Sequence, residues 1–128
     1  MWVGYLADSF DLINVRDLDL IAQARARCSR LVVGVFTDDD DYAEWLFGRR
    51  PVVPPSERIA VLRHVRGIDE VVAHHDGSDF GTPDGILFAA DDAPRDLADH
   101  AVWLTPGRRS KSVVLRHALA AEDQEAVA

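Results

Sequence analysis

Five charged or amide side chains occur between residues 8 and 17, where a short apolar run ends and a helical pattern begins. They are Asp8, Asp11, Asn14, Arg16 and Asp17. In α/β folds the turn from strand to helix is where phosphate groups are held, because the helix start presents unpaired N–H groups. Any of the three carboxylates could act as a general base, and the arginine could hold an anion. We therefore expect ligand binding or proton transfer at this turn.

A second polar cluster begins near residue 108, where three cations and two hydroxyls open a helical pattern. Its members are Arg108, Arg109, Ser110, Lys111 and Ser112. Such a helix start could bind an anion, and a plain solvated helix start is an equally good interpretation of the same residues. Two further carboxylates, Asp91 and Asp92, follow the apolar run "ILFAA".

Apolar runs alternate with helical patterns along the chain. Strands are predicted at 2–6, 31–36, 69–75, 86–90 and 101–104, and helices at 17–28, 56–66 and 113–119. The run "LVVGVF" is apolar throughout, as is typical of a strand covered on both faces. This alternation predicts an α/β fold with a parallel sheet and helices on both faces, so ligands should bind beyond the carboxyl ends of the strands. In the first helix, Leu18, Leu20, Ile21 and Ala22 are expected to face the core.

Composition narrows the possible partners. The chain has 128 residues, enough for one domain over 1–121 followed by an acidic tail at 122–128. Its formal net charge of −8 disfavours nucleic acid and anionic membranes as partners. No apolar run approaches the roughly 18 residues of a membrane span. The single cysteine, Cys28, excludes an intrachain disulfide and any multi-cysteine zinc site. A cytoplasmic protein is expected.

Two longer stretches resemble a known family. "SFDLINVRDLDLIAQARARCSRLVVGVFTDD" and "GRRPVVPPSERIAVLRHVRGIDEVV" are similar in order, spacing and flanking apolar residues to the small bacterial glycerol-phosphate cytidylyltransferases. That family has a pattern close to G-T-F-D-L-x-H-x-G-H, then K-P-x-x-P-x-x-E-R. The resemblance implies a three-layer, Rossmann-like nucleotidyltransferase fold with a five-stranded parallel sheet in the order 3-2-1-4-5. It also implies a homodimer, formed near Trp45, Leu46 and Phe47.

The resemblance places altered residues at the positions that carry the family's chemistry. Asn14 and Asp17 replace the two histidines that stabilise the phosphoryl group under attack, and Arg16 replaces the glycine between them. Asp8 and Ser9 replace Gly-Thr. Nucleotidyl transfer depends on cations or donors aimed at developing negative charge, and a carboxylate there repels a polyphosphate. We therefore expect transfer chemistry to be lost or much reduced.

The rest of the implied site is altered in part, because residues 108–112 read R-R-S-K-S where the family has I-S-T-T. The resemblance gives ligand contacts to residues of the first turn, the central loop and the loops after the last two strands. With the turn positions already named, these are Phe10, Asp11, Arg49, Arg50, Arg58, Asp91, Asp92 and residues 108–112. The expected ligand is a small phosphorylated or anionic molecule such as CTP, and magnesium is expected only with a bound nucleoside triphosphate. No metal site is predicted otherwise.

Three functions stay open at this point. The chain could be a silent relative that binds a nucleotide or phosphorylated metabolite or supports a partner enzyme. It could be a divergent transferase that uses Arg16 and the 108–111 cluster. It could also be another enzyme that uses Asp8, Asp11 or Asp17 as its base. The loss of the histidines favours the first hypothesis. For Asp11 there is also a structural interpretation, as the cap of the first helix.

Overall fold

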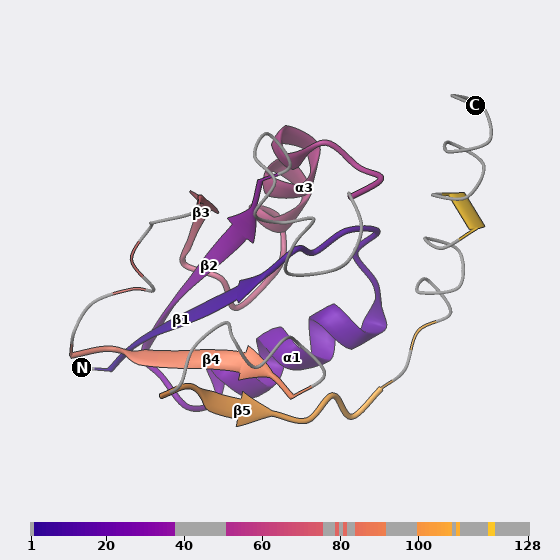
Figure 1. Cartoon of the computed structure of the whole chain (residues 1–128). Helices are drawn as coiled ribbons and strands as arrows, with labels where there is room; N and C mark the ends of the chain where they lie inside the picture. The colour runs from indigo at the N-terminus through magenta and orange to yellow at the C-terminus, as the bar shows by residue number, and fades with distance from the viewer. Residues whose placement is uncertain are drawn as a thin grey trace.

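The architecture is taken from a computed structural model, which describes residues 2–37, 51–75, 79, 81, 84–91, 100–108, 110 and 118–119. Five parallel strands form one sheet in the order β3-β2-β1-β4-β5. They are β1 (Val3–Asp8), β2 (Arg30–Phe36), β3 (Glu70–His74), β4 (Ile86–Ala90) and β5 (Val102–Leu104). The predicted strands and their order are confirmed (Figure 1).

Two described helices pack on one face of this sheet. Helix α1 (Val15–Arg25) contacts β1, β2 and β5, and α3 (Pro55–Leu62) contacts β2 and β3 (Figure 1). Both contribute to one apolar core with Leu6, Val33 and Phe88 from the sheet. The opposite face carries a second apolar cluster that includes Tyr5, Phe36 and Leu87. No helix within the described ranges is long and apolar enough to cross a membrane.

Helix α1 differs from its prediction in position and in phase. It begins at Val15 and ends at Arg25, whereas the pattern predicted 17–28. Leu18 is 45% exposed and Ala22 is exposed too, so the prediction that both face the core was wrong. The sequence carries two apolar stripes at helical spacing, and it is the stripe containing Leu20, Ile21 and Ala24 that packs on the sheet. The outward stripe stays in solvent.

Helix α3 begins as predicted and ends early. Pro55 occupies its first turn, where a missing N–H costs nothing. Leu62 is fully buried, and Ile59 and Val65 pack against the same core. The helix ends at Leu62 instead of residue 66, so Val65 reaches the core from the following turn.

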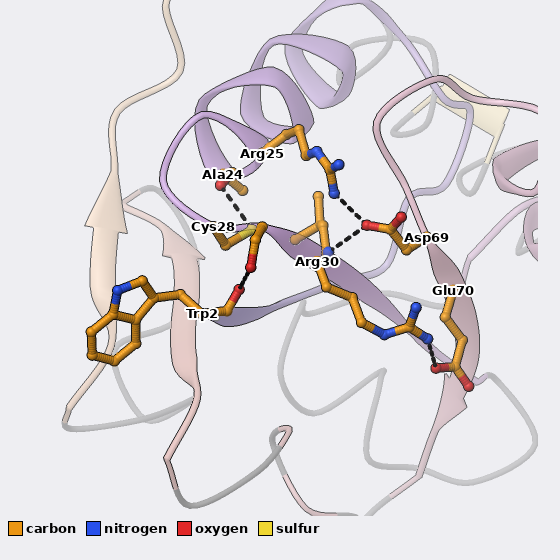
Figure 2. A network of polar contacts seen from close by, with 9 residues as sticks. Trp2, Ala24, Arg25, Cys28, Arg30, Asp69 and Glu70 are labelled. Atoms are coloured by element: carbon orange, nitrogen blue, oxygen red, sulfur yellow. Dashed lines mark hydrogen bonds and ion pairs between the residues drawn. The ribbon is translucent and has the colours of Figure 1, made fainter.

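A polar network holds the amino ends of the strands together (Figure 2). The Asp69 carboxylate accepts a hydrogen bond from the Leu31 amide at 2.8 Å and pairs with Arg25 at the end of α1. The Leu31 hydrogen bond is the main reason that the pKa of Asp69 is lowered. Ser29 Oγ donates to the Trp2 carbonyl oxygen at 2.9 Å. These contacts fasten α1 to the sheet at the end opposite the predicted ligand site.

A buried tyrosine crosses the second face of the sheet to reach a histidine two strands away. Tyr5 Oη on β1 lies 2.8 Å from His74 Nδ1 on β3. The crossing is possible because the intervening β2 position is Gly34, where a Cβ would lie 2.1 Å from the Tyr5 hydroxyl oxygen. Burial raises the pKa of Tyr5 to about 12 and lowers the pKa of His74.

These two shifts predict a loss of stability at both pH extremes. Above pH 10 an unfolded chain ionises Tyr5 while the folded chain does not, so unfolding becomes easier as pH rises from about 10 to about 12. We expect a loss of up to about 3 kcal/mol there. As pH falls through about 6.5, the unfolded chain protonates His74 more readily than the folded chain, so the free energy of unfolding also decreases in this range. Urea unfolding at a series of pH values measures both arms, and Tyr5→Phe should flatten the alkaline one. An unchanged alkaline arm in Tyr5→Phe would contradict this assignment.

Candidate functional site

The carboxyl ends of β1 and β4 meet at the point where the strand order reverses, which is where open α/β sheets bind ligands. The turn that leaves β1 at this point has an uncommon backbone. Phe10 and Leu12 have φ of 52° and 51°, in the left-handed region that favours glycine. Each costs about 1–2 kcal/mol, and the burial of Phe10 in the core offsets part of that cost. The backbone of this turn is therefore held in a fixed, strained shape.

Asn14 is the N-cap of α1. Its Oδ1 accepts from the Arg16 amide at 2.9 Å, and its Nδ2 donates to the Leu12 carbonyl oxygen at 3.0 Å. The prediction that Asp11 caps this helix was therefore wrong. At the position of the first family histidine, the amide side chain stabilises the turn and the helix start.

Arg16 lies between two carboxylates. Its Nη1 is 3.0 Å from Asp17 Oδ1 and 3.7 Å from Asp8 Oδ2. Asp17 is only 3% exposed, and Asp8 Oδ1 also accepts from the Ser9 amide at 2.7 Å. The positive charge of Arg16 thus offsets the carboxylates of Asp8 and Asp17. Two carboxylates against one guanidinium leave this group with a formal charge of −1, which disfavours a triphosphate.

Asp11 and Arg58 hold the loop before α3 against the first turn. Both side chains are buried, at 2% and 1% exposure. Asp11 accepts from the amides of Val52 and Val53 at 2.8 and 2.9 Å. Arg58 donates from Nε to the Val53 carbonyl oxygen at 2.8 Å, and from Nη1 to the carbonyl oxygens of Ser9 and Phe36 at 2.7 Å each. The structure therefore places Arg58 in the interior, and its role as a ligand contact stays a prediction.

The loop after β5 is held by side chains of α1. Asp19 Oδ2 accepts from the Gly107 amide at 2.7 Å, and Gln23 Nε2 donates to the Thr105 carbonyl oxygen at 2.8 Å. Thr105 Oγ1 donates to Asp91 Oδ2 at 2.5 Å. Asp91 is thereby joined to the neighbouring strand end.

Arg108 lines a shallow hollow of about 240 Å³ on the outer face of α1. The other lining residues are Val15, Leu18, Asp19 and Ala22. Sequence reasoning missed Asp19 and Gln23. Their separation of four positions on a predicted helix was the available signal, since such Asp–Gln pairs interact across one turn.

The predicted site residues thus fall into separate groups. Asp8, Arg16 and Asp17 form one, Asp11 and Arg58 a second, and Arg108 belongs with Asp19. Ser9 and Phe10 are buried in the turn, and Ser110 is half-buried. The remaining predicted positions, Arg49, Arg50, Asp92, Arg109, Lys111 and Ser112, lie outside the described residues, as do Trp45, Leu46 and Phe47. Among the described side chains, no three His, Cys, Asp or Glu residues are placed to hold a metal ion.

Comparison with known proteins identifies the family of this chain. The profile of the cytidylyltransferase-like family matches residues 6–79, more than half of the chain. The chain belongs to the cytidylyltransferase-like family. The match contains the end of β1 and all of α1, β2, α3 and β3, so it covers the first turn and the contacts that Asp11 and Arg58 make with the loop before α3.

Curated relatives of this cytidylyltransferase-like chain are much longer proteins. The bifunctional protein HldE of Halorhodospira halophila is 33% identical over 103 residues, 77% of this chain and 21% of that protein. The ethanolamine-phosphate cytidylyltransferase of Arabidopsis thaliana is 33% identical over 69 residues, 54% of this chain and 16% of that protein. The chain spans about a fifth or less of the length of these relatives.

A solved structure shares the fold. The crystal structure of the lipopolysaccharide core biosynthesis protein from Thermoplasma volcanium covers 86% of this chain and 99% of its own, with a TM-score of 0.67 at 17% identity. At that identity the likeness supports the arrangement of strands and helices alone.

Proposed function

We propose that this cytidylyltransferase-like chain binds a nucleotide or another small phosphorylated metabolite in the cytoplasm, with cytidylyl transfer lost or much reduced. One observation carries the proposal: the residues that replace the two histidines and their glycine are engaged with one another and with the turn. Asn14 caps α1, and Arg16 pairs with Asp17 and approaches Asp8. None of these contacts aims a donor at the charge that develops during transfer.

The family supports the choice of ligand class. One relative is named for a cytidylyltransferase that acts on ethanolamine phosphate, which pairs a nucleotide with a small phosphate ester. We propose that Arg108 supplies the anion contact in this chain, with the contributions predicted for Arg109 and Lys111. Residues 8–17 instead present excess negative charge. A magnesium ion would accompany a nucleoside triphosphate only.

Assembly belongs to the same proposal. A homodimer through the apolar Trp45-Leu46-Phe47 segment fits the family resemblance, and a partner enzyme could use the same bound metabolite. No described contact favours the two other functions. The carboxylates considered as a general base are each engaged: Asp11 with two amides, Asp8 with an amide, and Asp17 with Arg16.

Calorimetry with CTP, ATP and ethanolamine phosphate tests the proposal. Arg108→Ala should weaken binding by roughly 10- to 150-fold, because a hydrogen bond to a charged group contributes on the order of 1.5–3 kcal/mol when formed. Arg66→Ala is the matched control, since Arg66 is also exposed but follows α3. Equal weakening in both variants would mean that only net charge matters. The absence of binding to all three compounds would rule the proposal out.

A further inference from the structure

The Asp19 carboxylate on α1 is held by donors from two segments. Its Oδ2 accepts from the Gly107 amide at 2.7 Å and from Gln23 Nε2 at 2.8 Å. Arg108, the next residue in the chain after Gly107, lines the same hollow as Asp19. An amide N–H, a side-chain amide and a guanidinium are thus gathered around one carboxylate on the protein surface.

These groups are the kinds of donor that bind phosphate and carboxylate groups in ligands. These donors already favour the ionised form of Asp19, as a binding site for an anion would. The pKa of its carboxyl is lowered chiefly by the Gly107 hydrogen bond, then by Gln23, and the positive charge of Arg108 adds to this. Asp19 therefore stays ionised and occupies the place that the oxyanion of a ligand would take.

The walls of the hollow suit the rest of a small ligand. Val15 and Leu18 are 43% and 45% exposed, and with Ala22 they form an apolar surface beside Arg108. A ligand with one anionic group and an apolar or aromatic portion could place each part on a matching surface. The volume of about 240 Å³ is slightly below that of ordinary small-molecule sites, which begin near 300 Å³.

We propose that the Gly107 amide, Gln23 and Arg108 form a binding site for one phosphate or carboxylate group, and that Asp19 fills this site until a ligand displaces it. The inference rests on the proposed function, because it concerns the anion contact through Arg108. It adds Gly107 and Gln23 as ligand contacts and Asp19 as an internal competitor that lowers the affinity of the site.

The alternative is that Asp19 only anchors the loop after β5, and one substitution separates the two roles. In Asp19→Asn the amide oxygen can still accept from Gly107, so the anchor is kept while the negative charge is removed. If Asp19 competes with the ligand, Asp19→Asn should bind the ligand more tightly than wild type does. If Asp19 only anchors the loop, the affinity of Asp19→Asn should be unchanged. Removing one unit of like charge at about 4 Å in water corresponds to an increase in affinity of roughly fivefold.

The experiment is titration of the full chain with inorganic phosphate and with CTP, followed by calorimetry and by the Gly107 amide resonance in NMR spectra. Wild type, Asp19→Asn and Glu70→Gln are compared. Glu70→Gln makes the same charge change at an exposed position at the start of β3. Tighter binding in Asp19→Asn alone, with a shift of the Gly107 resonance on phosphate addition, is the expected result.

Three other outcomes overturn the inference. An equal gain in affinity in Asp19→Asn and Glu70→Gln would mean that only the net charge of the chain matters. Unchanged or weaker binding in Asp19→Asn, with wild type still binding through Arg108, would leave Asp19 as an anchor and the proposed function intact. Failure of wild type and Asp19→Asn to bind either compound would remove the site, and the proposed function would fall with it only if ATP and ethanolamine phosphate also failed to bind.

Discussion

Arg58→Ala is expected to lower the free energy of unfolding by about 3–5 kcal/mol, a range typical of breaking a buried charged contact. The side chain is 1% exposed, and its guanidinium donates to three carbonyl oxygens at the ends of β1 and β2 and in the loop before α3. Alanine would leave these oxygens without their donor and create a cavity.

Two further variants show whether the effect comes from these hydrogen bonds. Arg63→Ala changes an exposed arginine next to the end of the same helix, and it should alter stability by less than about 0.5 kcal/mol. Arg58→Lys keeps the charge but loses the planar arrangement of donors, so we expect an intermediate loss. Urea unfolding measures all three. A loss below about 1 kcal/mol in Arg58→Ala would mean that the three carbonyl oxygens find other partners.

The strands of this fold could be predicted from the sequence, because each depends on the residues of one short segment. The runs "LVVGVF" and "ILFAA" gave β2 and β4 to within one residue, since a strand covered on both faces must be apolar throughout. The phase of α1 could not be predicted in the same way. Its sequence carries two apolar stripes, and only packing on the sheet selects the one containing Leu20 over the one containing Leu18.

The predicted site was less complete, because its contacts join residues far apart in the chain. Asp11 meets Val52 and Val53, and Asp19 meets Gly107. A motif supplies the types of residue and their spacing, but it does not say whether an arginine such as Arg58 faces solvent or the interior. Asn14 shows the same limit, because either Asn or Asp is a good helix cap and the backbone decided between Asn14 and Asp11.

The first turn combines a strained backbone with an excess of carboxylates. Phe10 and Leu12 have left-handed backbone angles, and Asp11 and Arg58 hold the neighbouring loop. A turn under such strain is typical of functional sites. In this chain the same turn presents Asp8 and Asp17 beside Arg16. A strained turn with excess negative charge fits the proposed binding role without transfer.

Release of pyrophosphate from CTP is therefore expected to be at least about 10⁴-fold slower than in family members that keep both histidines, because each lost donor costs roughly 10²–10³ in rate. The measurement is pyrophosphate release with glycerol phosphate, ethanolamine phosphate and other phosphorylated acceptors. Asn14→His/Arg16→Gly/Asp17→His restores the donors and removes Asp17 and Arg16 together, so it should raise the rate. If wild type releases pyrophosphate at an ordinary family rate, then Arg16 or the loop after β5 replaces the histidines.

If wild type is slow and the triple variant is folded but equally slow, a further defect lies outside this turn. The loop that carries Arg108 is the candidate, because it also departs from the family pattern.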